Sequence, residues 1–346
     1  MAKLSKSSSF YSILLAITLT PLTHAETSKH PNSHAFSDPD YVATMHDGFM
    51  ETAINYGDKV AADVEVVISL GQQTYPAFHK IVEMIAEQQG IKVDVQQGTC
   101  GATAKKLLEK SVDIGTYCCP PGKTDRLPGL KFNTVAVAPI ALVTHKDNPV
   151  SDITSVDARK IFKGEYVSWS EVPAYPNLSD KLKGERIQPV ARMHCKKRPG
   201  HWRSLMSNAD ELSPRAELVG TIPDTISQVA NNMGAIGYET PFMLKVHEDK
   251  GTLKILNIDG KNPEELEHLL TGNYPIYRSY NMTTWTNENN RNEKAELLME
   301  AIYDYVQSHG EQYGFIPAEK LKLAGWKFKG RELIAEPEGH AVISQH

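Results

Sequence analysis

The chain has 346 residues, of which 40% are hydrophobic and 23% are charged, and its net charge is −5. These values are typical of a soluble globular protein and exclude a disordered or fibrous chain. A negative net charge also excludes the broad basic surface of a nucleic-acid-binding protein. At this length we expect two lobes or domains instead of one small core.

Residues 1–25 have the layout of a secretory signal peptide. Two lysines precede an apolar run over residues 10–17, and small residues lead to a cleavage site after about Ala25. The run is shorter than the roughly 20 apolar residues that cross a bilayer, so we expect cleavage and not anchoring. Residues 26–62 are polar, and we expect a solvated leader there. The mature protein is therefore predicted to be periplasmic.

The segment that follows alternates between strands and helices. Strands are expected at 64–68, 91–95, 112–115 and 135–143, with a helix after the first strand that stops at Gly90 and another helix after the second. Further along, we expect helices at 153–162 and 226–233 and a strand at 235–238. The last strong helix is expected to place Leu297, Leu298, Ala301, Ile302 and Tyr305 on one face. This alternation predicts an α/β fold with parallel strand pairing.

Six short segments, taken together, resemble the periplasmic phosphate-binding proteins of ABC transporters. They lie in that family's order over about residues 64–330. The segments are 71–76, 98–101, 112–115, 158–164 followed by Trp169, 234–238 and 314–317. The resemblance implies a type 2 periplasmic-binding-protein fold, in which two α/β lobes joined by two hinge crossings close over a ligand cleft.

The same resemblance implies how the chain is divided. The hinge crossings are expected near residues 141–144 and 237–240. Lobe 1 would then comprise 63–141 and 240–335, lobe 2 the inserted segment 142–239, and 336–346 a tail. The implied function is a non-enzymatic, monomeric solute-binding protein that delivers a small inorganic ligand to a membrane ABC permease or a periplasmic sensor domain.

Two turns carry the chemistry of an anion site independently of the family. Thr74, and the run Thr99, Cys100 and Gly101, sit where a predicted strand gives way to a helix. Backbone N–H groups at such a turn, with the positive end of the helix dipole, bind anions. We therefore count these four residues as candidate ligand-binding residues.

The chain departs from the family pattern at the positions that bind the ligand in that family. By position, a serine of the family becomes Cys100, and a Ser-Asp pair becomes Cys118 and Cys119. The family's arginine is retained as Arg192, but it is followed by His194 and Cys195 and then by a basic run at 196–203. All four cysteines of the chain thus fall within predicted ligand loops.

Three interpretations of these cysteines stay open. Thiolates from several loops suit a soft ion such as copper(I), zinc or arsenite, with His194 as an additional metal ligand. Side chains alternate along an extended segment, so only one of Cys118 and Cys119 should face the cleft, which leaves three cleft thiols at most. The second interpretation is a phosphate-like oxyanion with a structural disulfide from Cys100 to Cys118 or Cys119, because an even cysteine count outside the cytoplasm is typical of disulfides. The third is a thiol-based redox or metal-transfer protein.

Overall fold

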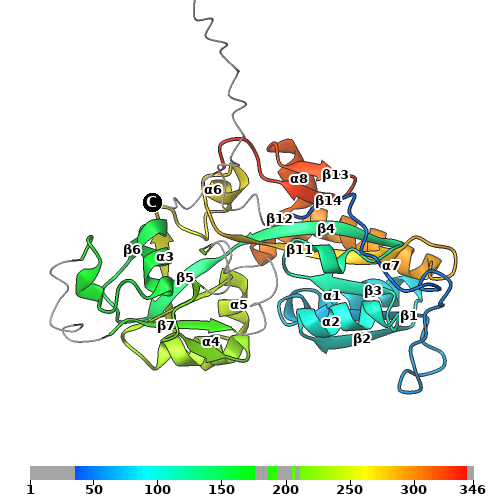
Figure 1. Cartoon of the computed structure of the whole chain (residues 1–346), viewed down its shortest axis with the longest axis horizontal. Coiled ribbons are helices and arrows are strands. Elements are labelled where there is room, and N and C mark those ends of the chain that lie inside the picture. Colours follow the sequence, from blue (N-terminus) through cyan, green and yellow to red (C-terminus); the bar gives the residue numbers. More distant parts are fainter. Residues whose placement is uncertain (1–35, 176–181, 183–185, 193–204, 207–210, 341–346) are drawn as a thin grey trace, which may run out of the picture.

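The computed structural model describes residues 36–175, 182, 186–192, 205–206 and 211–340. Within them the chain builds two six-stranded sheets that lie end to end (Figure 1). The first sheet has the order β12-β4-β11-β3-β1-β2, and the second has the order β6-β10-β5-β9-β7-β8. Helices pack on both sheets, and this arrangement confirms the predicted two-lobed α/β fold.

The bounds of the elements are as follows. The first sheet contains β1 (Val66–Gly71), β2 (Val93–Gly98), β3 (Ile114–Tyr117), β4 (Leu130–Pro139), β11 (Tyr277–Trp285) and β12 (Ile316–Pro317). The second contains β5 (Ala141–His145), β6 (Asp152–Ile153), β7 (Gln188–Arg192), β8 (Glu217–Val219), β9 (Ala235–Glu239) and β10 (Leu253–Ile258). The α-helices are α1 (Thr74–Gln89), α2 (Cys100–Leu108), α3 (Ser155–Lys163), α4 (Ile222–Ala230), α5 (Pro241–Val246), α6 (Leu266–Leu270), α7 (Glu293–His309) and α8 (Ala318–Leu323). The described residues also contain a small hairpin of β13 (Lys327–Lys329) and β14 (Glu332–Ala335) and the 3-10 turns η2 (Lys123–Asp125), η3 (Trp169–Glu171), η7 (Glu248–Lys250) and η8 (Gly310–Tyr313).

Local sequence explains where the helices begin and end. Threonine hydroxyls accept a backbone N–H at the start of α2, α3, α4 and α5, which satisfies a donor that the helix itself leaves open. Helix α1 ends at Gly90, whose φ of 65° lies in the left-handed region that a side chain disfavours. The predicted stop at Gly90 is therefore confirmed.

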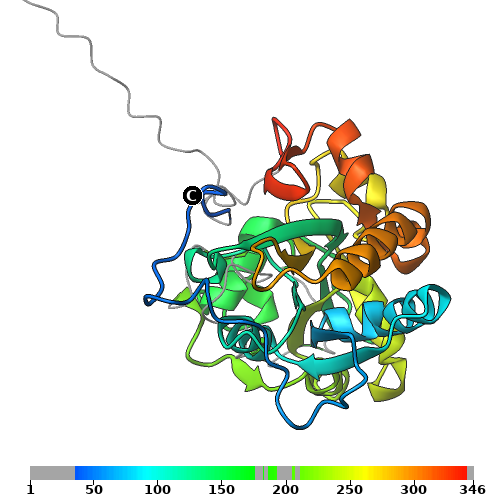
Figure 2. The ribbon, with the colours of Figure 1, turned by 90° about the vertical axis from the view of Figure 1, so that its right-hand side faces the viewer.

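The core of the first sheet has two sides. Helices α1 and α7 cover one face, where the α1 residues Phe78 and Val82 pack with Ile68 of β1. Helix α2 covers the other face, where Leu107 packs with Val67. Figure 2 shows α1 and α7 on the same side of the sheet. In α7 the buried face differs from the expected one, because Leu297 is 59% exposed while Leu298 and Ile302 are buried.

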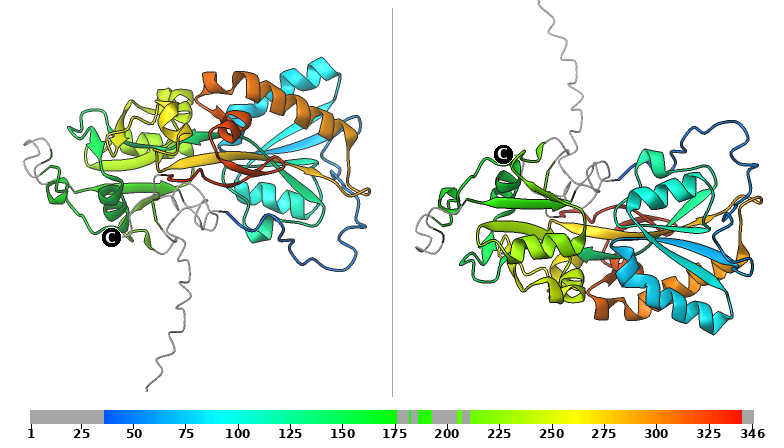
Figure 3. Two further views of the ribbon diagram at one scale, coloured as in Figure 1. Left: turned by 90° about the horizontal axis from the view of Figure 1, so that it is seen from above. Right: turned by 90° about the horizontal axis from the view of Figure 1, so that it is seen from below.

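Two long strands carry the chain between the sheets. Strand β4 continues through Ile140 into β5, and the chain returns from the second sheet at Tyr277, where β11 begins. The two crossings lie side by side, since the Ile140 amide donates to the Ile276 carbonyl oxygen at 3.1 Å. Figure 3 shows this connection from above and below.

The return crossing lies later in the chain than the expected 237–240. Strand β9 ends at Glu239 inside the second sheet, and β10 then pairs antiparallel with β5, from Leu253 opposite His145 to Leu256 opposite Leu142. The sequence assignment placed 240–276 in lobe 1 because the strand over 253–258 was not recognised. Its pairing with β5 holds this segment to the second sheet.

The expected solvated leader packs against the first sheet over the part that the structure describes. Phe49 is buried beside Trp285, and Lys110 lies over the Phe49 ring while donating to the Phe49 and Thr52 carbonyl oxygens. Apolar side chains scattered through this polar stretch, among them Met45, Met50 and Ile54, supply the contacts. The predicted signal peptide lies outside the described residues. Among those that are described, no helix has the length and apolarity needed to span a bilayer.

Candidate functional site

The candidate site forms where β1, β2 and β3 reach their carboxyl ends. Cys100 is the first residue of α2, directly after β2, and Cys118 follows the last residue of β3. Their Sγ atoms lie 3.4 Å apart. Because β1 lies between these two strands in the sheet, the end of β1 at Gly71 also borders Cys100: a Cβ built there would be 3.6 Å from Cys100 Sγ. Two cysteines that the sequence assigned to separate ligand loops are thus in contact.

The contact between the two sulfurs is not a disulfide bond. A disulfide has a sulfur–sulfur distance of about 2.05 Å, whereas these sulfurs are 3.4 Å apart. Cys118 is buried and Cys100 is half-buried. The pair therefore consists of two thiols close enough to bind one ion together or to be oxidised to a disulfide.

Cys119 differs from its neighbour. A hydrogen bond with Cys118, together with burial, raises the pKa of the Cys119 thiol well above its usual value. The Cys119 carbonyl oxygen accepts a hydrogen bond of 2.8 Å from the Asn281 side chain, which ties this residue to β11. A thiol that stays protonated is a poor ligand for a soft ion, so Cys118 is the better candidate of the two.

The two threonines of the predicted site use their hydroxyl groups within the protein. Thr74 is buried, and its Oγ1 lies 2.6 Å from Thr116 Oγ1 and donates to the Gly71 carbonyl oxygen. Thr99 Oγ1 accepts the Ala102 amide at the start of α2. Both side chains shape the turns at the strand ends. Gly101 occupies the second position of α2, as the expected strand-to-helix turn requires.

A buried network of ionic groups joins the two sheets beside these turns. Glu239, the last residue of β9, is completely buried. Its carboxylate lies 2.5 Å from Arg192 Nη1 and 3.6 Å from Arg278 Nη2. From the first lobe, Gln73 Nε2 donates to both Glu239 oxygens at 2.9 Å. Gln73, two residues after the end of β1 at Gly71, therefore links the first lobe directly to the carboxylate that pairs with Arg192.

The ion pairs and hydrogen bonds of this network determine the protonation state of Glu239. Burial alone would raise the pKa of Glu239, but Arg192 and Arg278, with hydrogen bonds from Thr240 and Gln73, hold it below its ordinary value. Glu239 is therefore ionised at neutral pH. Arg192 therefore meets an internal anion, the Glu239 carboxylate.

Sequence reasoning found some of these residues and missed others. Arg192, predicted to reach the ligand from the inserted lobe, lies at the end of β7 and pairs with Glu239, and its contact with a ligand stays a prediction. Gln73 lies inside a segment that the resemblance singled out and Glu239 in the expected crossing at 237–240, but nothing in their local pattern indicated an ion pair. Arg278 carries no sequence signal, because only the pairing of β11 brings it to Glu239.

The predicted ligands of the second lobe lie outside the described residues. These are His194 and Cys195, together with the basic run at 196–203. Among the residues that the structure places, no three His, Cys, Asp or Glu side chains are grouped so as to hold a metal ion. The described part of the site thus offers a thiol pair on the first lobe and an arginine network between the sheets.

Comparison with known proteins gives consistent matches. The sequence pattern of the family described as "PBP superfamily domain" matches residues 57–306. The chain is 26% identical over 251 residues to the phosphate-binding protein PstS of Bacillus subtilis, which covers 70% of this chain and 76% of that protein. It is 29% identical over 124 residues to the phosphate-binding protein PstS 2 of Streptococcus agalactiae. That shorter match spans 36% of this chain and only 42% of the streptococcal protein's length.

Solved structures show the same fold. One is a putative phosphate ABC transporter substrate-binding protein with bound phosphate from Clostridium perfringens, with a TM-score of 0.60 and 23% identity. The match covers 73% of this chain and 98% of that one. Another is an ABC-type phosphate transport receptor from Vibrio cholerae, with a TM-score of 0.57 and 17% identity, covering 73% of this chain and 99% of that one.

Proposed function

The chain belongs to the PBP superfamily, and from this premise we propose that it is a periplasmic solute-binding protein that captures a small ligand between two lobes. The names of the matching proteins from Bacillus subtilis and Clostridium perfringens, a phosphate-binding protein and a putative ABC transporter substrate-binding protein, support a receptor role over an enzymatic one. A membrane ABC permease is then the expected partner, with a periplasmic sensor domain as the alternative.

The proposed ligand is a thiophilic ion or metalloid bound by Cys100 and Cys118. The observation that carries this proposal is the 3.4 Å separation of the two sulfurs at the strand ends. Thiolate ligands select soft ions, whereas hydroxyl groups and carboxylates suit phosphate and hard ions. Cys195 and His194 complete the predicted ligand set from the second lobe.

The sulfur separation also bears on which soft ion fits. Two thiolates that each lie about 2.3 Å from one ion, a typical metal–thiolate distance, subtend about 95° at that ion when their sulfurs are 3.4 Å apart. A linear two-coordinate copper(I) ion would need a separation of about 4.6 Å by the same bond length. The pair as placed is therefore better suited to a bent arrangement, such as the pyramidal coordination of trivalent arsenic or the tetrahedral coordination of zinc.

A phosphate-like oxyanion is the second candidate, favoured by a different observation. Arg192 and Arg278 are both buried, and both face the Glu239 carboxylate. Guanidinium groups bind planar oxyanions well. For such a ligand to reach Arg192, however, it has to compete with the Glu239 carboxylate at 2.5 Å.

Calorimetric titration of the reduced, full-length protein separates the two candidates. Arsenite, zinc, copper(I) and inorganic phosphate are titrated in turn into the wild type and into the Cys100→Ser and Cys118→Ser variants. We expect a soft ion to bind the wild type and to lose affinity about tenfold or more in either variant. Cys119→Ser is the matched control, and its affinity should be unchanged.

The opposite result would support the second candidate. Phosphate would then bind the wild type and the two cysteine variants equally, and Arg192→Ala would weaken that binding by about 1.5–3 kcal/mol, as expected for a charge-assisted hydrogen bond.

A further inference from the structure

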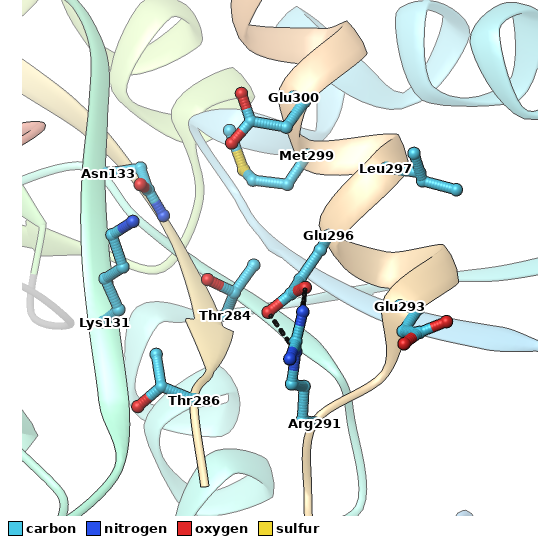
Figure 4. A pocket seen from close by; sticks show the side chains of 10 residues that line it. All are labelled: Lys131, Asn133, Thr284, Thr286, Arg291, Glu293, Glu296, Leu297, Met299 and Glu300. Atoms are coloured by element: carbon cyan, nitrogen blue, oxygen red, sulfur yellow. Dashed lines mark hydrogen bonds and ion pairs between the residues drawn. The ribbon is translucent and has the colours of Figure 1, made fainter. Parts of the chain in front are cut away.

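A pocket lies at the end of the first sheet that is remote from the crossings between the sheets. It has a volume of about 500 Å³ and opens between the start of β4, the end of β11 and the first half of α7 (Figure 4). The hinge crossings at Pro139 and Tyr277 stand at the opposite ends of the same two strands. The thiol pair and the Glu239 network do not contribute to its lining. The pocket is therefore separate from the candidate site described above, and its volume is in the range of small-molecule sites.

The floor of this pocket contains two buried polar side chains with unused hydrogen-bonding capacity. Asn133 is 2% exposed and Thr284 is 6% exposed. Asn133 Nδ2 donates weakly to the Met282 carbonyl oxygen at 3.4 Å. Within the described part of the chain, Asn133 Oδ1 and Thr284 Oγ1 have no hydrogen-bond partner. Neither atom is fully enclosed by the protein, so both face the pocket and are available to a ligand that donates and accepts hydrogen bonds.

The walls of the pocket carry opposite charges. On the helix side, Glu296 is held by Arg291 in a bidentate pair with distances of 2.8–3.0 Å. Figure 4 shows the Glu296 carboxylate directed toward Thr284, across the space between helix and strands. On the strand side stands Lys131, opposite Thr284 in the register of β4 and β11. No ion pair of Lys131 or of Glu293 occurs among the residues that the structure describes.

Charge neutralisation narrows the choice of ligand. Glu300 is paired with Arg331 at 2.6 Å and Glu296 with Arg291, so these two carboxylates are already compensated. Lys131 is then the cation of the lining without an ion pair among the described residues, whereas the Glu293 side chain is directed away from the strands, so that the carboxylate facing the pocket is that of Glu296 (Figure 4). A simple anion would meet the carboxylates of α7, and an apolar molecule would leave the polar floor unsatisfied.

We propose that this pocket binds a small zwitterion, a free α-amino acid or a dipeptide. The ligand carboxylate lies toward Lys131, and the ligand ammonium group lies between Asn133 Oδ1 and the carboxylates of α7. Met299, whose side chain lies on the strand side of α7, provides an apolar contact for a side chain (Figure 4). This binding is independent of the ligand in the interlobe site.

The test is a binding screen with defined probes. Each free α-amino acid, and glycylglycine as the dipeptide, is added to the full-length protein at about 1 mM, the weak end of specific affinity, and thermal unfolding and calorimetry are recorded. We expect at least one probe to bind. Its N-acetylated and its amidated forms, which each lack one charge, should bind about tenfold more weakly or worse, since each loses a charge-assisted hydrogen bond.

Variants decide whether the probe sits in this pocket. Lys131→Gln and Thr284→Val should each weaken binding of the same probe, whereas Lys327→Gln, an exposed lysine of β13, should not. Cys100→Ser, at the other site, should leave the affinity unchanged. The proposal is overturned if no zwitterion binds the wild type, if Lys131→Gln leaves binding intact, or if Cys100→Ser abolishes it.

Discussion

Replacing Glu239 by glutamine removes the negative charge at the centre of the buried network. The carboxylate is completely buried, and it faces Arg192 at 2.5 Å and Arg278 at 3.6 Å. Glutamine keeps the size of the side chain but removes the negative charge that faces two buried guanidinium groups. Breaking a buried ion pair in this way costs about 3–5 kcal/mol. Because both sheets contribute to the network, the loss should also weaken the contact between the lobes.

Equilibrium unfolding in guanidinium chloride measures this effect. Glu311→Gln is the matched control: it removes the same charge from an ion pair with Lys320 at 2.7 Å, but both of those side chains are about half exposed. Exposed pairs contribute about 0–1 kcal/mol, so the control should barely change the free energy of unfolding. The reasoning is refuted if Glu239→Gln is no more destabilising than Glu311→Gln.

Three further predictions concern the pH dependence of stability, the pH dependence of ion binding and the packing of the leader. The pKa of Glu239 is lowered in the folded protein. The ionised carboxylate therefore stabilises the fold above the unfolded pKa of about 4.3, and this stabilisation is lost as the pH falls through the lower folded value. Urea midpoints measured from pH 7 downward should fall more in the wild type than in Glu239→Gln. Binding of a soft ion should weaken as the pH is lowered below neutral, since protons compete for thiolates with an ordinary pKa near 8.5; a calorimetric affinity independent of pH would argue against thiolate ligation. Because Phe49 packs beside Trp285, Phe49→Ala should destabilise the protein by about 3–5 kcal/mol. It should also make the chain near Met45 and Met50 sensitive to limited proteolysis. An unchanged digestion pattern would show that other contacts hold this segment.

Local patterns were sufficient to predict most elements of the fold. The run of β-branched residues at 64–68 and the glycine at position 90 define a strand and a helix end by short-range physics. Strand β10 was missed because Leu253–Ile258 alternates weakly and is recognisable only through its partner β5. The packed leader was missed for a similar reason, since Phe49 is one apolar residue among polar ones and its burial depends on Trp285 and Lys110, which are far away in the sequence.

The candidate site shows the same limit. The positions of Cys100 and Cys118 could be predicted from their places at strand ends, because parallel strands bring their carboxyl ends to one edge. Their distance of 3.4 Å could not, since it depends on the side-chain packing of three separate segments. The Glu239 network could not be predicted either, because it joins residues of β7, β9, β11 and the β1–α1 turn that meet only after both sheets have formed.

The most direct test of the proposed function is the mass of the protein, isolated from cells without reductant, before and after alkylation. Under native conditions we predict one bound soft ion per chain. Cys100 and Cys118 should resist iodoacetamide while the ion is present and become alkylated after a chelator or a competing dithiol removes it. The contradicting result is a protein without any ion in which Cys100 and Cys118 are joined by a disulfide and become alkylated only after reduction.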